Sequence, residues 1–323
     1  MNTVIRVTGI GSYLPGKVLT NEDISRIVDT DDEWIRSRSG ITKRHIAEDG
    51  EFTSDLGTEA AKNALRHAGL TTDDIDLIVV ATATPDQTFP ATATVIQHKL
   101  GIRRGAAFDV AAVCSGFIFA LATADALMRN SEFQKALVIG AETFSRILDW
   151  TDRSTCVLFG DGAGAVVLEK DQTSSNEQIG LLGHYLRTDG AQHDLLYVDG
   201  GPSSTQTVGH LRMKGNAVFK HAIVNISSAV ENLLSKSEVS AQDVDWFVPH
   251  QANQRILDGV AKHLKIEHSR VISTVALHAN TSAASVPLAL SEGVSDGRVK
   301  TGDLILTEAM GGGFAWGANL FRL

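Results

Sequence analysis

The sequence predicts an α/β fold built from two similar halves. Short runs rich in β-branched residues alternate with helical segments, which is typical of a mostly parallel sheet covered by helices. A weak internal repeat is the second observation. Residues 73–86 (DDIDLIVVATATPD) resemble 242–254 (QDVDWFVPHQANQ), and 159–169 (FGDGAGAVVLE) resemble 311–321 (GGGFAWGANLF), in the same order. Two such short matches can also arise by chance in an α/β protein.

The expected elements follow this alternation along the chain. Strands are expected at 77–84, 106–110, 135–142, 164–170, 246–250 and 303–309, and a buried helix at 117–128. The polar stretch 170–178 (KDQTSSNEQ) reads as a loop, which predicts a division into halves 1–172 and 173–323. The glycine clusters GDGAG and GGG precede strands, whereas a dinucleotide-binding loop precedes a helix. A site between the halves would draw residues from both.

Composition and charge exclude several classes of protein. A net charge of −9 argues against general nucleic-acid binding. The apolar charge-free run between Asp109 and Asp125 is too short for a membrane span, which needs about 20 residues. The opening MNTVIRVTGIGSYLPG does not resemble a signal peptide, and no metal-binding motif is present. The two cysteines, Cys114 and Cys156, suggest neither a disulfide framework nor a CxxC motif, so we expect a cytoplasmic protein.

Cys114 is the candidate nucleophile. It lies in the turn between the expected strand 106–110 and the expected helix 117–128. Free amides and the partial positive charge at a helix N-terminus lower the pKa of a thiol, which predicts a reactive cysteine. The alternative is a small thiol that fills a strand-to-helix corner. Cys156 lies in the strand-like TCVLFGD and is expected in the core.

His250 and Asn280 are candidate partners of this thiol. His250 ends an apolar strand, and Asn280 precedes small residues that begin a helix. Each also has a purely structural explanation, as a strand-end histidine bonded to backbone and as a helix cap. Strand ends in matching α/β halves converge on one face of a sheet, which favours a shared site.

Cysteine, histidine and asparagine also form the site of papain-like peptidases. His250 follows Cys114 by 136 residues (250 − 114), within that family's range of about 130–150. Asn280, 166 residues after Cys114 (280 − 114), fits less well. The local sequence CSGF, the missing disulfides and the missing pro-segment argue against a peptidase.

Eight motifs together point to a known family. They run from GIGSYLP through DTDDEWI, SGITKRHIA, CSGF, FGDGAGA, VPHQAN and NTSAASVP to GGGFAWG. With these motifs the whole chain resembles β-ketoacyl-acyl-carrier-protein synthase III, the family of condensing enzymes that initiate bacterial type II fatty acid synthesis. The resemblance implies a thiolase-like fold, with two α/β halves stacked in five α/β/α/β/α layers, and a homodimer.

The resemblance also implies a two-step reaction without a cofactor or metal. Cys114 would accept a short acyl group, most often acetyl, from acyl-CoA. His250 and Asn280 would then hold the thioester carbonyl of malonyl-acyl-carrier protein while CO2 leaves. The amides of Cys114 and Gly313 would form the oxyanion hole for acyl transfer.

Substrate-binding residues follow from the same resemblance. CoA binding is expected at Trp34, Arg38 and Arg153, and Phe89 would close the acyl pocket of the partner subunit. Docking of the carrier protein is expected at Arg255, Lys262, Arg212 and Lys214, since an acidic carrier protein would meet a basic patch. Without the resemblance, Trp34 would be an ordinary half-buried aromatic residue, and the basic residues a solvated surface.

Four positions depart from the family pattern, and two alternative functions stay open. Ala279, Ser39, Ser154 and Met310 stand where glycine, threonine, glycine and phenylalanine are common. The first alternative is a related ketosynthase or acyltransferase that initiates a secondary metabolite. The second, from a different class, is a non-catalytic protein that binds acyl carriers.

Overall fold

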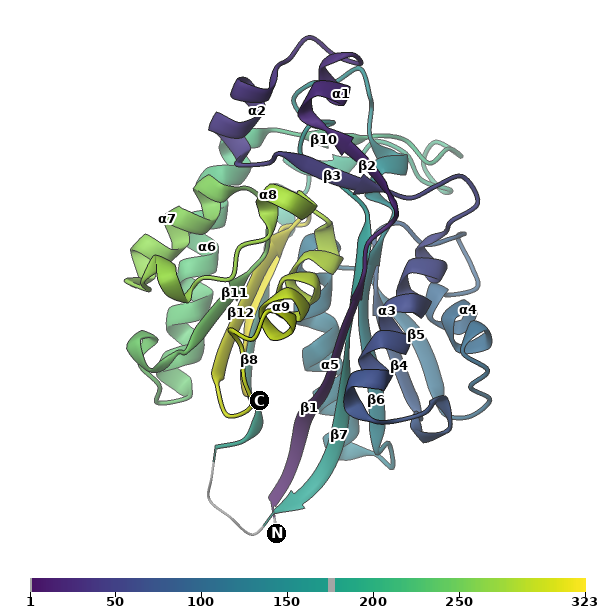
Figure 1. The fold of residues 1–323 in the computed structure, drawn as a ribbon, viewed down its shortest axis with the longest axis vertical. Helices are drawn as coiled ribbons and strands as arrows, with labels where there is room; N and C mark the ends of the chain where they lie inside the picture. The colour runs from purple at the N-terminus through teal and green to yellow at the C-terminus, as the bar shows by residue number, and fades with distance from the viewer. Residues whose placement is uncertain (1, 174–177) are drawn as a thin grey trace.

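Two large β-sheets and three layers of helices form the body of the protein, in the order α/β/α/β/α (Figure 1). The computed structural model describes residues 2–173 and 178–323. Helices α5 and α9 lie between the sheets, α3 and α4 cover the outer face of the first sheet, and α6 and α7 flank the outer face of the second. This is the five-layered arrangement that the family resemblance implied.

The first sheet has five strands in the order β1-β7-β6-β4-β5. Strand β4 is parallel to both β5 and β6, whereas β7 is antiparallel to β6 and β1. The strands are β1 (Asn2–Tyr13), β4 (Leu77–Ala81), β5 (Ala106–Val110), β6 (Lys135–Glu142) and β7 (Gly162–Thr173).

The second sheet repeats four strands of the first. It comprises β8 (Gly180–Thr188), β11 (Trp246–Pro249), β12 (Leu304–Gly311) and β13 (Ala315–Arg322). Its order β8-β13-β12-β11, with one parallel pair and two antiparallel pairs, matches β1-β7-β6-β4. The sequence repeat paired the segments of β4 with β11 and of β7 with β13, and these strands hold equivalent places. The internal repeat is therefore confirmed.

Long helices pack against both sheets, and the two central ones enter through a short 3₁₀ turn. Helix α5 follows η2 (Val113–Ser115), and α9 follows η7 (Ser282–Ala284). Because α5 lies between the two sheets, its sequence is apolar on nearly every side. The six long helices are α3 (Thr53–Ala68), α4 (Thr92–Lys99), α5 (Gly116–Asn130), α6 (Gly215–Lys236), α7 (Gln254–Leu264) and α9 (Ser285–Ser295).

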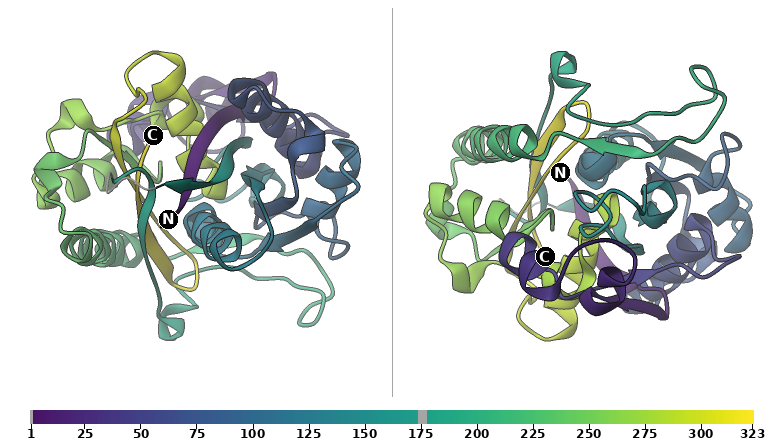
Figure 2. Two further views of the ribbon diagram at one scale, coloured as in Figure 1. Left: turned by 90° about the horizontal axis from the view of Figure 1, so that it is seen from below. Right: turned by 90° about the horizontal axis from the view of Figure 1, so that it is seen from above.

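Shorter elements cover the end of the molecule at which β4 and β11 finish (Figures 1 and 2). They are β2 (Lys17–Thr20), α1 (Asn21–Ser25), α2 (Asp32–Ser39), β3 (Lys43–Ile46), η3 (Phe144–Ile147), η4 (Gly190–Gln192), β9 (Leu196–Val198), β10 (Leu211–Met213) and α8 (Val275–His278). The remaining 3₁₀ turns are η1 (Thr72–Asp74), η5 (Ala241–Asp243) and η6 (His268–Arg270).

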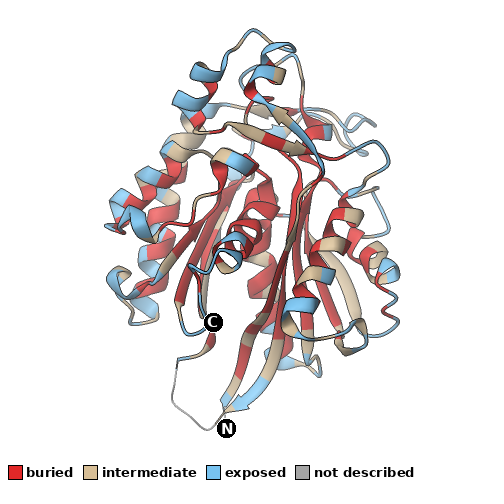
Figure 3. Ribbon diagram, viewed as in Figure 1, coloured by how far each residue is buried: buried red, intermediate tan, exposed pale blue. Residues whose placement is uncertain are grey.

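Burial follows the layers: the sheets and the central helices form the interior (Figure 3). Every strand of the first sheet comes from residues 2–173, and every strand of the second from 180–322. Helix α9 nevertheless packs on β1 and β7, so the division into two domains at residue 172 stays a prediction. Within the described ranges, none of the helices is long and apolar enough to cross a membrane.

One strand is shorter than the sequence pattern suggests. We expected a strand through residue 84, but β4 ends at Ala81. The hydroxyls of Thr82 and Thr84 and the amide of Ala83 all donate hydrogen bonds to the buried carboxylate of Glu142. These bonds turn the chain out of the sheet and toward the pocket described next.

Candidate active site

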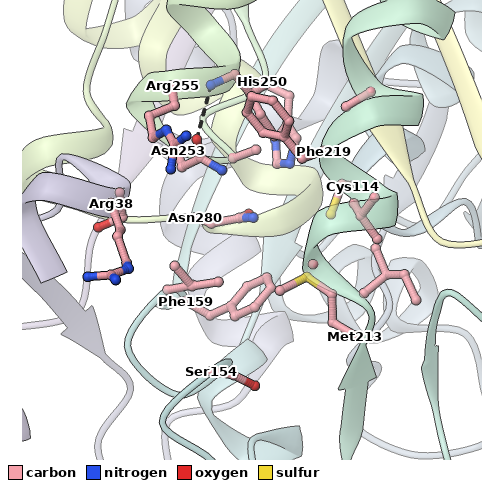
Figure 4. Close-up of a pocket in the computed structure, with 18 of the residues that line it drawn as sticks. Arg38, Cys114, Ser154, Phe159, Met213, Phe219, His250, Asn253, Arg255 and Asn280 are labelled. Carbon is pink, nitrogen blue, oxygen red and sulfur yellow. Dashed lines mark hydrogen bonds between the residues drawn. The ribbon is translucent and has the colours of Figure 1, made fainter. Parts of the chain in front are cut away.

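Cys114, His250 and Asn280 line a single cavity of about 360 Å³ (Figure 4). Cys114 comes from the first half of the chain, at the start of α5, and the other two come from the second half. The cavity extends outward past Trp34 and Arg38. The three residues that the sequence predicted to meet therefore do meet.

Cys114 lies in η2, directly before α5, as the sequence predicted. Its side chain is 3% exposed. Burial, together with the smaller effect of the nearby charge of Glu142, raises the pKa of the Cys114 thiol to about 12. The expected lowering of the pKa is therefore wrong for the unliganded site, because loss of hydration outweighs the effect of the helix terminus.

Glu142 is a buried carboxylate close to the thiol. Burial raises the pKa of Glu142 to about 7, although Thr84 donates to Oε2 at 2.6 Å and the amide of Ala283 donates to Oε1 at 3.4 Å. The hydroxyl of Ser282 lies near both groups and lowers the pKa of each, without reaching hydrogen-bond geometry to either. Glu142 therefore joins β4, β6 and η7 beneath the nucleophile.

Each of the two 3₁₀ turns packs closely on a glycine in a strand of the other half. A Cβ at Gly140 would lie 2.3 Å from the carbonyl oxygen of Ala283, and a Cβ at Gly311 would lie 2.7 Å from the amide nitrogen of Cys114. Both turns begin with positive φ, at 48° for Val113 and 49° for Ser282. Non-glycine residues in this region are strained, and such strain gathers at functional sites.

His250 follows the last residue of β11 and is 4% exposed. Burial lowers the pKa of its imidazole to about 3, so the ring is neutral at pH 7. The ring is anchored by Ser285, whose Oγ lies 2.6 Å from Nδ1. The prediction that backbone groups alone satisfy a strand-end histidine does not describe this ring.

Asn280 is fixed by three hydrogen bonds. Its backbone bonds to Leu158 and Gly160, each at 3.0 Å, and its side-chain Oδ1 accepts from the amide of Ser282 at 2.9 Å. The side chain therefore caps η7 rather than α9. Because Oδ1 is occupied, the Nδ2 amide is the part of the side chain that can donate into the cavity.

Trp34 and two arginines gather at the mouth of the cavity. The guanidinium carbons of Arg38 and Arg153 lie 4.5 and 5.2 Å from the centre of the indole ring. Arg153 also donates to the backbone of Asp29 at 2.8 Å, which holds it beside the ring. A half-buried indole beside two cations suits a planar base that carries phosphates.

The basic residues expected to dock a carrier protein differ in whether they form ion pairs with carboxylates. Arg255 lies at the rim of the cavity, and Lys262 lies on the same helix, α7. Arg212 bonds Asp149 and Asp199, and Lys214 bonds Asp194. Among the residues that the structure describes, no carboxylate pairs with Arg255 or Lys262.

Phe89 and Gly313 lie outside the contacts that define the cavity wall. The side chain of Phe89 is 81% exposed on the loop between β4 and α4. Gly313 lies in the turn between β12 and β13 and has a φ of 140°. Their expected roles, in a partner's acyl pocket and in an oxyanion hole, stay predictions.

Several wall residues were not found from the sequence. Apolar side chains narrow the passage to Cys114. The side chain of Asn253 also lines this passage, and it caps α7 because its Oδ1 accepts a hydrogen bond from the backbone N–H of Ile256 at 3.0 Å. The cap was readable, since asparagine before an amphipathic helix is a standard start signal. The apolar residues carry no such signal: Phe159, Met213, Phe219 and Met310.

No metal centre is built from the described residues: nowhere in 2–173 and 178–323 do three or more His, Cys, Asp or Glu side chains gather in a way that could hold an ion. The chemistry that this cavity offers is that of a thiol, a neutral imidazole and an amide.

Comparisons with known proteins agree with this geometry. A model of 3-oxoacyl-[acyl-carrier-protein] synthase III matches residues 108–190, and a model of its C-terminal part matches 234–323. The β-ketoacyl-[acyl-carrier-protein] synthases III of Hyphomonas neptunium and Rhodospirillum centenum are each 63% identical to the chain and cover 98% of both sequences. The crystal structure of the Aquifex aeolicus enzyme superposes with a TM-score of 0.92 at 44% identity, covering 99% of this chain and 100% of that one.

Fold and site define an acyl-transferring condensing enzyme of the thiolase-like type. The chain belongs to the β-ketoacyl-acyl-carrier-protein synthase III family. The alternative, a ketosynthase that initiates a secondary metabolite, shares the fold. The priming β-ketosynthase of the R1128 polyketide pathway gives a TM-score of 0.93 over 99% of this chain and 96% of that one, but only 33% identity. Sequence similarity therefore favours the synthase III function.

Proposed function

We propose that the protein starts fatty acid synthesis by joining a short acyl group, acetyl in the simplest case, to malonyl-acyl-carrier protein. In the first step, the sulfur of Cys114 attacks the thioester carbonyl of acyl-CoA. The carbon–sulfur bond to CoA breaks, and CoA leaves as a thiol that carries the cysteine's proton. A thiol suits this role because it accepts and releases acyl groups readily.

In the second step, the malonyl group loses CO2 while its thioester oxygen receives hydrogen bonds from His250 and Asn280. The electron pair released by carbon–carbon cleavage is held as an enolate, and its carbon attacks the acyl carbonyl on Cys114. The sulfur then leaves with its electron pair as a thiolate, and a proton from solvent regenerates the thiol of Cys114. Two neutral donors stabilise the enolate oxygen, and one such donor is worth about 3 kcal/mol of barrier.

Substrate binding follows the cavity from its mouth to the thiol. Trp34, Arg38 and Arg153 would bind the adenine and phosphates of CoA, and the apolar passage fits a pantetheine arm. Arg255 and Lys262, which pair with no carboxylate of the described residues, support carrier docking more strongly than Arg212 and Lys214, which already pair with carboxylates.

A homodimer is part of the proposal. Strand β5 is the edge of the first sheet and is half-buried along its whole length, with apolar Phe108 and Val110 among its residues. An apolar edge strand is a template for pairing with a second copy. The exposed Phe89 on the neighbouring loop would then reach the partner's cavity.

We further propose a cytoplasmic location and no cofactor. A nucleophilic thiol needs a reducing compartment, and both cysteines are free. Each step above uses only groups of the protein and its two substrates, so treatment with a chelator should leave turnover unchanged.

The shared cavity of Cys114, His250 and Asn280 carries this proposal, and the two half-reactions test it. After incubation with acetyl-CoA, peptide mass spectrometry should locate the acetyl group on Cys114 and not on Cys156. Asn280→Ala should slow release of CO2 from malonyl-acyl-carrier protein by about 10²- to 10³-fold and leave acetylation nearly unchanged. An unacetylated Cys114 during turnover, or equal losses in both steps, would contradict the assignment.

A further inference from the structure

Ser285 is the first residue of α9, and it contacts the His250 ring on the side that faces away from the cavity. The serine is 1% exposed. Its Oγ lies 2.6 Å from Nδ1 of His250 and 3.4 Å from the backbone nitrogen of Gln251. One hydroxyl thus connects the start of α9 with two consecutive residues after β11.

The direction of these two hydrogen bonds follows from counting protons. The backbone N–H of Gln251 can only donate, so Ser285 Oγ is the acceptor in that bond. The hydroxyl has one hydrogen of its own to donate. Among the described residues, Nδ1 of His250 is the acceptor within reach of that hydrogen. Because a buried hydroxyl hydrogen without an acceptor is unfavourable, we assign Nδ1 as the acceptor of this bond.

The tautomer of His250 follows from the same count. The buried ring is neutral, so it carries a single N–H. If Nδ1 accepts, that hydrogen is on Nε2. Nδ1 is turned to α9, which leaves the Nε2 edge for the cavity that His250 shares with Cys114 and Asn280.

We propose that Ser285 is a positioning residue that holds His250 in the Nε2–H tautomer, so that the imidazole meets the substrate's thioester oxygen as a donor. This inference rests on the proposed function, because it assigns the direction of one of its two hydrogen bonds. In the opposite tautomer Nε2 would present a lone pair to the enolate oxygen and repel it.

A single short segment then fixes which side-chain nitrogen of Asn280 and of His250 donates into the cavity. The Ser282 amide occupies Oδ1 of Asn280 and leaves Nδ2 free, while the Ser285 hydroxyl occupies Nδ1 of His250 and leaves Nε2–H free. Residues 280–285 (NTSAAS) thus carry one donor and orient both. This accounts for a run of small polar residues that helix propensity alone leaves unexplained.

The wild-type enzyme supplies the first test. Nitrogen-15 NMR of protein labelled on its imidazoles distinguishes a protonated ring nitrogen from an unprotonated one. The His250→Gln variant identifies the signals of His250 among those of the eleven histidines. A protonated Nε2 and a bare Nδ1 are expected. A protonated Nδ1 in the unliganded enzyme would overturn the proposal, whatever the variants do.

The variants supply the second test. Ser285→Ala should let His250 populate the other tautomer and slow release of CO2 from malonyl-acyl-carrier protein by about tenfold, the value of one hydrogen bond. Acetylation of Cys114 should change less than about twofold. Ser285→Thr keeps the hydroxyl and should restore both the NMR signature and the rate.

The matched control is Ser291→Ala, which removes another buried hydroxyl from α9, one that bonds Ser12 at 2.9 Å. It should leave the tautomer and both half-reactions unchanged. If Ser291→Ala slows CO2 release as much as Ser285→Ala does, or if Ser285→Ala keeps the Nε2–H signature and the rate, the positioning role is wrong. Failure of wild-type acetylation would instead contradict the proposed function, because the tautomer is measured without substrate.

Discussion

Cys114, the proposed nucleophile, lies in a setting that disfavours its anion. Its thiol is buried and lies near the charge of Glu142, and both raise its pKa. The thiolate must therefore form at the moment of attack, when substrate brings a polar thioester against it. This differs from a cysteine that rests as a free thiolate, and it protects the unliganded enzyme from casual alkylation and oxidation.

Glu142 offers a test of this view. Glu142→Gln removes the nearby charge while keeping the acceptor for Thr84 and Ala83, so the pKa of the Cys114 thiol should fall. We expect alkylation of Cys114 by iodoacetamide at pH 8 to accelerate by about three- to tenfold. Glu308→Gln removes another buried carboxylate and serves as the matched control, with an unchanged rate. Equal rates in the Glu142 variant and the wild type would contradict the assigned influence.

At this scale the sequence predicts which residues share the cavity but not how their pKa values are shifted. The contexts of Cys114, His250 and Asn280 each mark the end of an element, which is visible in the chain. The pKa of Cys114 depends on how much water the folded site excludes, and the sequence predicted the wrong direction. The partner of His250, Ser285, lies 35 residues away along the chain, so only packing could reveal their contact.

Among the elements, α7 carries the clearest surface function. Asn253 caps its start, its buried face packs on α6, and its exposed Arg255 lines the cavity, with the exposed Lys262 further along the same helix. The helix and its cap were readable from sequence. Which basic residues are already paired with carboxylates was not, because those carboxylates lie on distant loops.

Lys262 tests docking without disturbing the cavity. Lys262→Glu should raise the KM for malonyl-acyl-carrier protein about three- to tenfold and leave self-acetylation by acetyl-CoA unchanged, since CoA does not need this face. The effect should shrink at high salt, because exposed charges are screened. Lys300→Glu, in the loop between α9 and β12, is the control and should leave this KM unchanged. An unaffected KM in Lys262→Glu at low salt would remove this residue from the docking face.

The loop before α4 tests whether a second subunit completes the pocket. If Phe89 enters the partner's cavity, Phe89→Ala should let longer acyl-CoA starters acylate Cys114, measured across a series of chain lengths. The rise for a starter of six or more carbons should be about tenfold, roughly what burying two methylene groups is worth. Phe52→Ala, another exposed phenylalanine at 45%, should not change the preference. An unchanged profile for Phe89→Ala in a confirmed dimer would refute this role.

For the whole molecule, the buried carboxylate of Glu308 links stability to pH. It is 2% exposed on β12, and burial raises its pKa to about 8 from an ordinary value of 4.5. Between these pH values the folded state keeps the proton and the unfolded state releases it, so stability falls as pH rises. Glu308→Gln stays neutral throughout.

The free energy of unfolding of Glu308→Gln, relative to that of the wild type, should therefore increase as the pH rises from 5 to 8. The gain should be at least about 1.4 kcal/mol, the value of one pKa unit, measured by urea denaturation at both pH values. Glu292→Gln, which changes an exposed carboxylate on α9, should show no such dependence. A constant difference between Glu308→Gln and the wild type at both pH values would show that Glu308 titrates normally.

The two-fold repeat was visible in the sequence because equivalent strands kept similar residues, and it correctly predicted equivalent positions for β4 and β11. The fifth strand β5, and the way α9 crosses onto the first sheet, were not predictable from it. They depend on how the halves pack, and each half buries its central helix only when the other is present.

Two glycines set the distance between the sulfur of Cys114 and the side chains of His250 and Asn280. With no Cβ at Gly140 or Gly311, each half brings its turn down onto the backbone of the other half. A single methyl group at either place would lift one turn and pull the nucleophile away from the groups that face it. The position of these turns therefore cannot be changed gradually by substitution at the two glycines. Adaptation to other starters would therefore come from the outer wall and from the proposed second subunit, while the centre formed by these turns keeps its dimensions.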